Sequence, residues 1–269
     1  MDGFIEKIKL DIENKIKFFE DPNFSFDEGS HVYKYKGQKF DSVTTFLKNF
    51  KTPFDKKYWA EKKAKERGVS VDEIYSEWDG KGQFANNLGT SVHKWIEDFW
   101  CGLSPVLPDD EECLSRVNKF LRIHERKLKF LIPIRSELRV FSKKWKLAGT
   151  IDELFLFWDK EKEKAILVIG DWKTNGDFKS DDHPKGRYKK LLRPFSGLYE
   201  NHHNEYSIQI SLYRLILEDE LGIETESGFL CHIGPDDEAK IYPAKDLRDP
   251  LRAYLDQNRG NDELDIFSI

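Results

Sequence analysis

The chain has 269 residues and carries 44 Lys and Arg against 49 Asp and Glu, which gives a net charge of −5. Its hydrophobic content of 39% and aromatic content of 14% exclude a disordered chain, and its length allows a large buried core. The net charge argues against uniform binding of polyanions, although a local basic channel would still attract them.

Apolar runs and cysteines exclude further classes of protein. The longest apolar run, 165–170, is far shorter than the roughly 20 residues that a membrane span needs. The first residues lack the basic and then apolar order of a signal peptide, so we expect a soluble, intracellular protein without membrane partners. The cysteines Cys101, Cys113 and Cys231 are too few for a four-thiolate zinc or iron–sulfur site and do not suggest a disulfide framework.

Hydrophobic periodicity predicts helices on both sides of a strand-rich centre. Helices are expected over 4–19, after a cap at Ser42, over 84–100, from 108–110 to about 131, over 205–221 and over 246–258. Strands are expected in a hairpin over 31–41 that turns at Lys36–Gly37, in the stretch 134–173, and over 228–233 and 239–243. This order predicts an α/β or α+β fold with a mixed sheet between helices.

Residues 48–67 combine charge with aromatic rings, because eight basic side chains stand against three acidic ones and four aromatic residues are interleaved. One interpretation is a solvated helix with an aromatic anchor. The other is a nucleic-acid surface, on which cations such as Lys62 and Lys63 hold phosphates while rings stack on bases. The segment alone favours neither interpretation.

Two acids are expected to face each other in the strand-rich centre. Two strand-like runs flank the polar turn 159–164, and a turn centred midway places Asp152 opposite Asp171, within one or two residues. Like charges on neighbouring strands destabilise a sheet unless they share a proton or hold a cation. Lys173 shares a strand face with Asp171. The set suits phosphodiester hydrolysis with a hard divalent ion, and the alternative is a structural Asp–Lys ion pair.

Other polar residues have both a functional and a structural interpretation. His93 lies on one helical stripe with Gly89 and Glu97, and it is either a ligand or an ordinary helical histidine. Gln209 and Tyr213 lie four residues apart, either on a helix beside the site, with Gln209 bonding the substrate or Lys173, or in ordinary packing. Glu137 is either a further acid at the metal or a surface charge.

The loop 185–193 follows the acid and lysine strand and contains no acid. Its position favours guidance of phosphates over a purely solvated loop. The basic residues concerned are Lys185, Arg187, Lys189, Lys190 and Arg193.

In chain order, these pieces resemble the PD-(D/E)XK nuclease superfamily, and within it the RecB-type branch with a Q-x-x-x-Y motif. That branch includes AddB-type nuclease domains, CRISPR spacer-processing exonucleases and the mitochondrial genome-maintenance exonuclease. The matching pieces are GTSVH (89–93), SELRVF (136–141), GTID (149–152), DWKT (171–174) and YSIQISLY (206–213). SVTTFL (42–47) also resembles an early motif of mitochondrial and phage members, and 194–218 is similar to stretches of phage-encoded nucleases.

The resemblance implies a restriction-endonuclease-like α/β core with a central mixed sheet flanked by helices. It divides the chain into an N-terminal helical and hairpin elaboration at 1–80, the nuclease core at 81–258 and a tail at 259–269. It implies Mg²⁺ or Mn²⁺ held by His93, Asp152, Asp171 and the Trp172 carbonyl, with Lys173 as catalytic lysine. Further implied roles are the helix motif for Gln209 and Tyr213, an auxiliary acid for Glu137, and DNA contacts for Ser42 and Thr44.

The chain departs from the family in two ways. Several relatives bind an iron–sulfur cluster through four cysteines, and this chain cannot, so no cluster is expected. No G-x-x-x-x-G-K-[ST] motif occurs, so any unwinding would come from a partner.

The C-terminal segment Glu263–Phe267 resembles the short acidic and hydrophobic peptides with which replication proteins dock onto sliding clamps. The alternative is ordinary packing of Ile266 and Phe267 onto the core.

The resemblance favours a metal-dependent DNA nuclease, an exonuclease on single strands or ends, in replication, recombination or repair in the cytoplasm of a bacterial or phage-infected cell. Two alternatives stay open: a catalytically weak, nuclease-like scaffold that binds a replication or recombination partner, and a structure-specific endonuclease.

Overall fold

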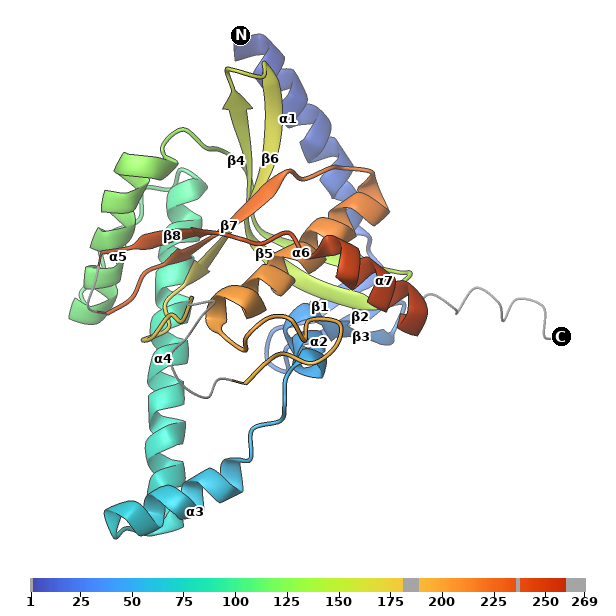
Figure 1. Ribbon diagram of the computed structural model, residues 1–269. Coiled ribbons are helices and arrows are strands. Elements are labelled where there is room, and N and C mark those ends of the chain that lie inside the picture. The colour runs from blue at the N-terminus through green and yellow to red at the C-terminus, as the bar shows by residue number, and fades with distance from the viewer. Residues whose placement is uncertain (1, 181–188, 236–237, 260–269) are drawn as a thin grey trace, which may run out of the picture.

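A computed structural model describes residues 2–180, 189–235 and 238–259, and Figure 1 shows a central sheet with helices on both faces. The sheet has eight strands in the order β1-β2-β3-β5-β6-β7-β8, and β4 pairs with β5. The strands are β1 Phe24–Asp27, β2 Val32–Tyr35, β3 Gln38–Ser42, β4 Ile132–Ser142, β5 Leu147–Asp159, β6 Lys164–Lys173, β7 Ser227–His232 and β8 Lys240–Pro243. Parallel and antiparallel pairs both occur, which confirms the α/β fold class with a mixed sheet flanked by helices.

The helices form two layers. They are α1 Asp2–Ile16, α2 Val43–Phe46, α3 Lys56–Arg67, α4 Val71–Trp100, α5 Glu111–Ile123, α6 His202–Leu221 and α7 Arg248–Arg259, with short 3-10 turns at Lys17–Glu20 and Leu47–Phe50. Apolar residues of α1, α6 and α7 share one core cluster with one sheet face, and those of α4 and α5 share another with the opposite face. Leu154 and Phe155 enter different clusters, as expected for a strand buried on both faces.

The hairpin register at the centre agrees with the prediction. Glu153 pairs with Gly170, and the ladder continues in step to Asp159 and Lys164 at the turn. The next position on each strand, Asp152 and Asp171, therefore lies where the symmetric turn places it. On its other edge β6 pairs in parallel with β7, which makes β6 an inner strand of the sheet.

The N-terminal hairpin and its cap also agree with the prediction. Lys36 and Gly37 form the turn with φ of 49° and 78°, the left-handed backbone of a tight hairpin. The Ser42 hydroxyl accepts a 3.0 Å hydrogen bond from the Thr45 amide and so caps α2. β1, a strand of four residues that extends this hairpin, was not predicted.

Two helix boundaries differ from the prediction. α4 begins at Val71 rather than at 84, because Ser70 and Glu73 form a reciprocal capping box that starts the helix early. α5 ends at Ile123, and the chain continues in a wide helical turn, His124–Leu128, instead of an α-helix to 131.

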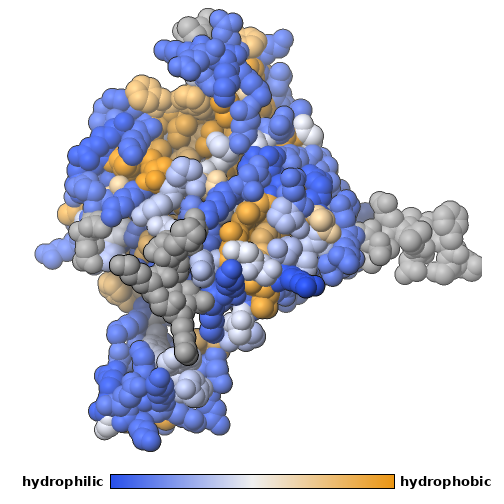
Figure 2. All heavy atoms as spheres, in the orientation of Figure 1, coloured by the Kyte–Doolittle hydropathy of each residue, from blue (hydrophilic) through white to orange (hydrophobic). Residues whose placement is uncertain are grey.

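α3 and the first half of α4 project from the sheet as an arm, at the bottom of Figure 1. A small cluster of Ala60, Ala64 and Ile74 holds the two helices together, and the face of the arm seen in Figure 2 is mostly hydrophilic. α4 runs continuously across residue 80, and β3 pairs with β5, so the predicted elaboration at 1–80 shares the sheet with the rest. The three-part division of the chain stays a prediction. None of the described helices is long and apolar enough to cross a bilayer.

Candidate active site

Five elements converge on the point where β5 and β6 stop pairing. Asp152 lies on β5, and its Oδ2 accepts a 2.8 Å hydrogen bond from the Trp172 amide on β6. On β6 the Asp171 Oδ2 lies 2.6 Å from the Lys173 Nζ. The Trp172 side chain points away into the core cluster under α4 and α5, as strand alternation predicts. The sequence prediction that Asp171 and Lys173 share a face is confirmed.

α4 contributes His93. Its Nδ1 lies 3.6 Å from the Asp152 Oδ2. Ligand atoms of His93, Glu137 and Asp152 all lie within 4.8 Å of one another, close enough to hold one metal ion. Gly89, one turn earlier, lets α4 approach, since an added Cβ there would lie 3.2 Å from the Thr174 Oγ1.

Glu137 reaches the site through an unusual backbone conformation. Its neighbours Ser136 and Leu138 pair with Glu153 and Ile151 on β5, while Glu137 itself has a φ of 47°. The left-handed region disfavours residues with a Cβ, and such conformations cluster at functional sites. Glu137 lines the cavity around Asp152 and His93, where reduced hydration and the Asp152 and Glu97 carboxylates raise its pKa to about 8.

α6 supports the acids from the opposite side. The Gln209 Nε2 donates to the Asp171 Oδ1 at 3.3 Å and to the Tyr213 hydroxyl at 3.4 Å. Of the two partners expected for Gln209, the substrate strand and Lys173, the structure gives neither: Gln209 bonds Asp171, while Lys173 lies over the Tyr206 ring at 4.5 Å. Tyr213 packs so closely on Gly149 that a Cβ there would lie 2.8 Å from the tyrosine Cε1.

Burial sets the protonation states at the site. It lowers the pKa of His93 to about 4, aided by the Lys173 ammonium, so the imidazole is neutral at neutral pH and free to act as a ligand. It raises the pKa of Asp171 to about 6 against the influence of Lys173, and it raises the pKa of Asp152 as well. Burial opposes the charge on Lys173, but Asp171 and Asp152 outweigh it and keep the pKa of the lysine above its ordinary value.

The structure separates the other predicted DNA contacts into two groups. Ser42 and Thr44 line a cavity of about 370 Å³ that Glu137, Asp152 and Gln209 also line, so they lie beside the acids. Lys62 and Lys63 lie on the projecting arm, over the rings of Trp59 and Trp78, and do not line the site cavities.

In the basic loop, Lys189, Lys190 and Arg193 are exposed. Lys190 pairs with Tyr199, which anchors this part of the loop. Lys185 and Arg187 lie outside the described residues, as does the segment Glu263–Phe267.

Arg116 on α5 supports the lysine strand and was not predicted from the sequence. This nearly buried guanidinium donates to the carbonyls of Thr174, at 3.4 Å, and Ile233, just beyond the ends of β6 and β7. A lone arginine in an amphipathic helix gives no pattern that marks such a contact.

Comparison with family models and with curated proteins gave no match. Among solved structures, one similar fold belongs to a chain described as a putative exonuclease from Eubacterium rectale. It is 12% identical with a TM-score of 0.40, and the match covers 65% of this chain and 64% of that chain. This chain thus spans just under two thirds of that chain's length, and a likeness this distant assigns neither family nor activity.

Proposed function

We propose that this protein is a metal-dependent nuclease that hydrolyses phosphodiester bonds of DNA, acting as an exonuclease on single strands or ends. One observation supports it most: α4, β5 and β6 bring His93, Asp152 and the pair Asp171 and Lys173 together at one end of the β5–β6 ladder. Glu137 adds a third carboxylate. The resemblance to PD-(D/E)XK nucleases named the same residues.

The donor set fits a hard divalent ion such as Mg²⁺ or Mn²⁺. His93, Glu137 and Asp152 offer a neutral imidazole and two carboxylates within 4.8 Å of one another. Like charges this close need a cation, and on the Asp171 side Lys173 provides one. A bound ion would polarise the phosphate and lower the pKa of the attacking water. The family's ligand set includes Asp171 and the Trp172 carbonyl beside His93 and Asp152, and we retain both as proposed ligands.

Each remaining residue has a role in the proposed hydrolysis. Lys173 is charged, so its ammonium can orient the attacking water or stabilise the charge that develops on the phosphate. Asp171 positions that ammonium, and Gln209 positions Asp171 in turn. Tyr213 holds the Gln209 amide through its hydroxyl. Ser42 and Thr44 are proposed to contact the substrate strand.

The depth of the site supports a single strand as substrate. Lys173, whose side chain is only 16% exposed, lines a cavity of about 880 Å³ between α4 and the β1–β2 turn, and its partner Asp171 is only 2% exposed. A single strand fits such a recess more readily than a stiff duplex. The DNA roles of Lys62, Lys63 and the basic loop, clamp docking through Glu263–Phe267, and a cytoplasmic place in replication, recombination or repair belong to the same proposal.

The experiment is incubation with Mg²⁺ or Mn²⁺ and end-labelled linear or circular single-stranded DNA, with Asp171→Ala as control. Loss of linear DNA alone identifies an exonuclease, because a circle has no end. Loss of both forms identifies an endonuclease. Cleavage by Asp171→Ala at the wild-type rate, or no cleavage of any DNA by wild type, contradicts the proposal.

A further inference from the structure

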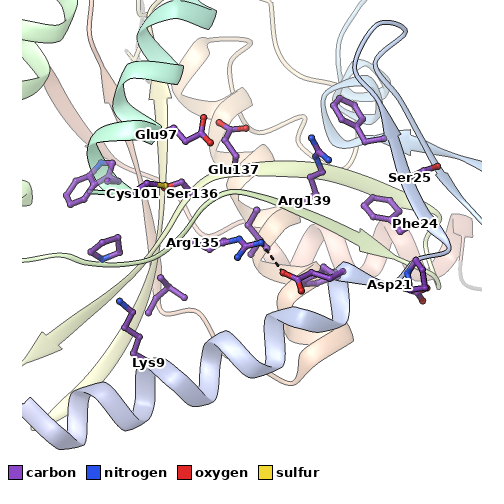
Figure 3. Close-up of a pocket in the computed structure, with 18 residues that line it drawn as sticks. Lys9, Asp21, Phe24, Ser25, Glu97, Cys101, Arg135, Ser136, Glu137 and Arg139 are labelled. Atoms are coloured by element: carbon purple, nitrogen blue, oxygen red, sulfur yellow. Dashed lines mark hydrogen bonds and ion pairs between the residues drawn. The ribbon is translucent and has the colours of Figure 1, made fainter. Parts of the chain in front are cut away.

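A second cavity, of about 950 Å³, adjoins the candidate site along β4 (Figure 3). We call it the β4 groove, after residues 133–139 on its floor. It lies between the end of α4 and the segment from α1 to β1. Glu97, Glu137 and Arg139 line both this groove and the cavity around His93, so the two are continuous. In Figure 3 the carboxylates of Glu97 and Glu137 lie close together at the top of the groove, and Arg139 follows on the same strand.

Arg139 lies at the junction on an aromatic ring. Its guanidinium is 5.1 Å from the centre of the Phe26 ring, and its Nη2 lies 3.0 Å from the Glu28 carboxylate. Both charged side chains of that pair are well exposed, at 48% and 78%. Such exposed pairs add little stability, so a phosphate can replace Glu28 at little cost. A guanidinium that is stacked on a ring still exposes the N–H donors at its edge, and their spacing matches that of phosphate oxygens.

Further along the groove the acids already have partners. Glu20 pairs with Arg135 at 3.0 Å, the contact dashed in Figure 3. Asp21 accepts hydrogen bonds from Asn23 and from the Tyr35 hydroxyl. Lys9 of α1 lines the same groove. The groove therefore presents Lys9 and Arg139 to a polyanion, with Glu20 and Asp21 engaged by the protein itself, while Glu97 and Glu137 stand at its junction with the candidate site.

We propose that Arg139, held on Phe26, binds the phosphate next to the one being cleaved, and that the substrate strand continues from there along the β4 groove. This inference rests on the nuclease function proposed above and adds a phosphate subsite to it. Continuity with the candidate site and the stacked guanidinium carry it, since Arg139 lies two residues from Glu137 on β4 and lines both cavities.

The test compares two substrates of different reach. The small diester bis(4-nitrophenyl) phosphate reports on hydrolysis at the metal, and a short single-stranded oligodeoxynucleotide also needs the groove. We expect Arg139→Gln to raise KM for the oligonucleotide about 10- to 100-fold, the usual effect of losing one charge-assisted hydrogen bond, and to change KM for the diester at least tenfold less. Phe26→Leu should act in the same direction more weakly.

Arg122→Gln is the matched control. Arg122 on α5 forms a similarly exposed pair with Glu238, at 3.1 Å, and lines neither cavity, so both substrates should be cleaved as by wild type. Equal losses on both substrates with Arg139→Gln would mean that Arg139 acts through Glu137 and the metal, and the inference would be wrong. No loss on the oligonucleotide would also overturn it.

If wild type cleaves neither substrate, the proposed nuclease function fails while the groove remains testable. Fluorescence anisotropy of a labelled oligonucleotide then measures binding directly. Weaker binding by Arg139→Gln, with Arg122→Gln unchanged, supports the groove, and equal binding by all three proteins overturns it.

Discussion

The Trp172 backbone amide donates a 2.8 Å hydrogen bond to the Asp152 carboxylate, so the strand that carries Asp171 and Lys173 also fixes the facing acid. Side-chain alternation turns the Trp172 ring into the core on the other face of the sheet. A buried indole thus anchors the backbone at the point where three ionisable side chains meet. The site is built on two paired strands, which makes its geometry rigid.

This contact leads to a prediction that separates fold from chemistry. Asp152→Asn keeps an oxygen that can accept from the Trp172 amide, so the fold should keep its stability, and removal of one buried charge favours it. Asp152→Ala leaves the amide unpaired and should cost about 1–3 kcal/mol. Both variants should lose Mn²⁺ binding and DNA cleavage. Titration calorimetry measures the Mn²⁺ binding of the two variants, and thermal unfolding measures their stability. Cleavage of DNA by Asp152→Asn at the wild-type rate would refute the assigned role.

A second prediction concerns the approach of α4 to the lysine strand. Gly89→Ala should gain up to about 1 kcal/mol in helix propensity but push the added methyl within 3.2 Å of the Thr174 Oγ1, next to Lys173. We expect cleavage to fall while thermal stability holds, and Thr174→Ala in the same chain to restore part of the activity. Gly82→Ala is the control in the same helix, since nothing lies within 4 Å of its new methyl. Equal effects of the two alanines would disprove a specific approach at Gly89.

The sequence predicted the parts of the site that depend on short-range rules. A symmetric turn sets the register that places Asp152 by Asp171, and alternation puts Lys173 on the same face. It could not predict the left-handed backbone of Glu137, because a non-glycine residue at positive φ follows from the surroundings rather than from its own preference. The sequence also could not predict the contact between Arg139 and Phe26, because Phe26 lies on β1, the four-residue strand that was not predicted.

The backbone of Glu137 leads to a third prediction, an opposed change in stability and activity. Glu137→Gly relieves the positive-φ strain, so the metal-free protein should gain about 1 kcal/mol. Metal affinity and cleavage should fall. Glu137→Gln keeps the strain and removes only the ionisable carboxyl group beside Asp152 and Glu97, so it should gain less stability than the glycine variant. Denaturant unfolding without metal ranks the free energies of unfolding of wild type and the two variants. A Glu137→Gly variant less stable than wild type would contradict the prediction.

The fourth prediction is that divalent metal binding strengthens as pH rises and releases protons. Without metal, Asp171 has a pKa of about 6 and Glu137 of about 8, so both acids are largely protonated at pH 5 and ionised only above these values. A metal ligand must be deprotonated, so binding should expel about one proton at pH 7, mainly from Glu137, more at pH 6, where Asp171 is also partly protonated, and fewer at pH 9. His93, with a pKa of about 4, is already neutral and should contribute almost none. Titration calorimetry with Mn²⁺ in buffers of different ionisation enthalpy counts the protons. Glu137→Gln should remove most of the release near pH 7, and a release unchanged in that variant would show that another group carries the proton.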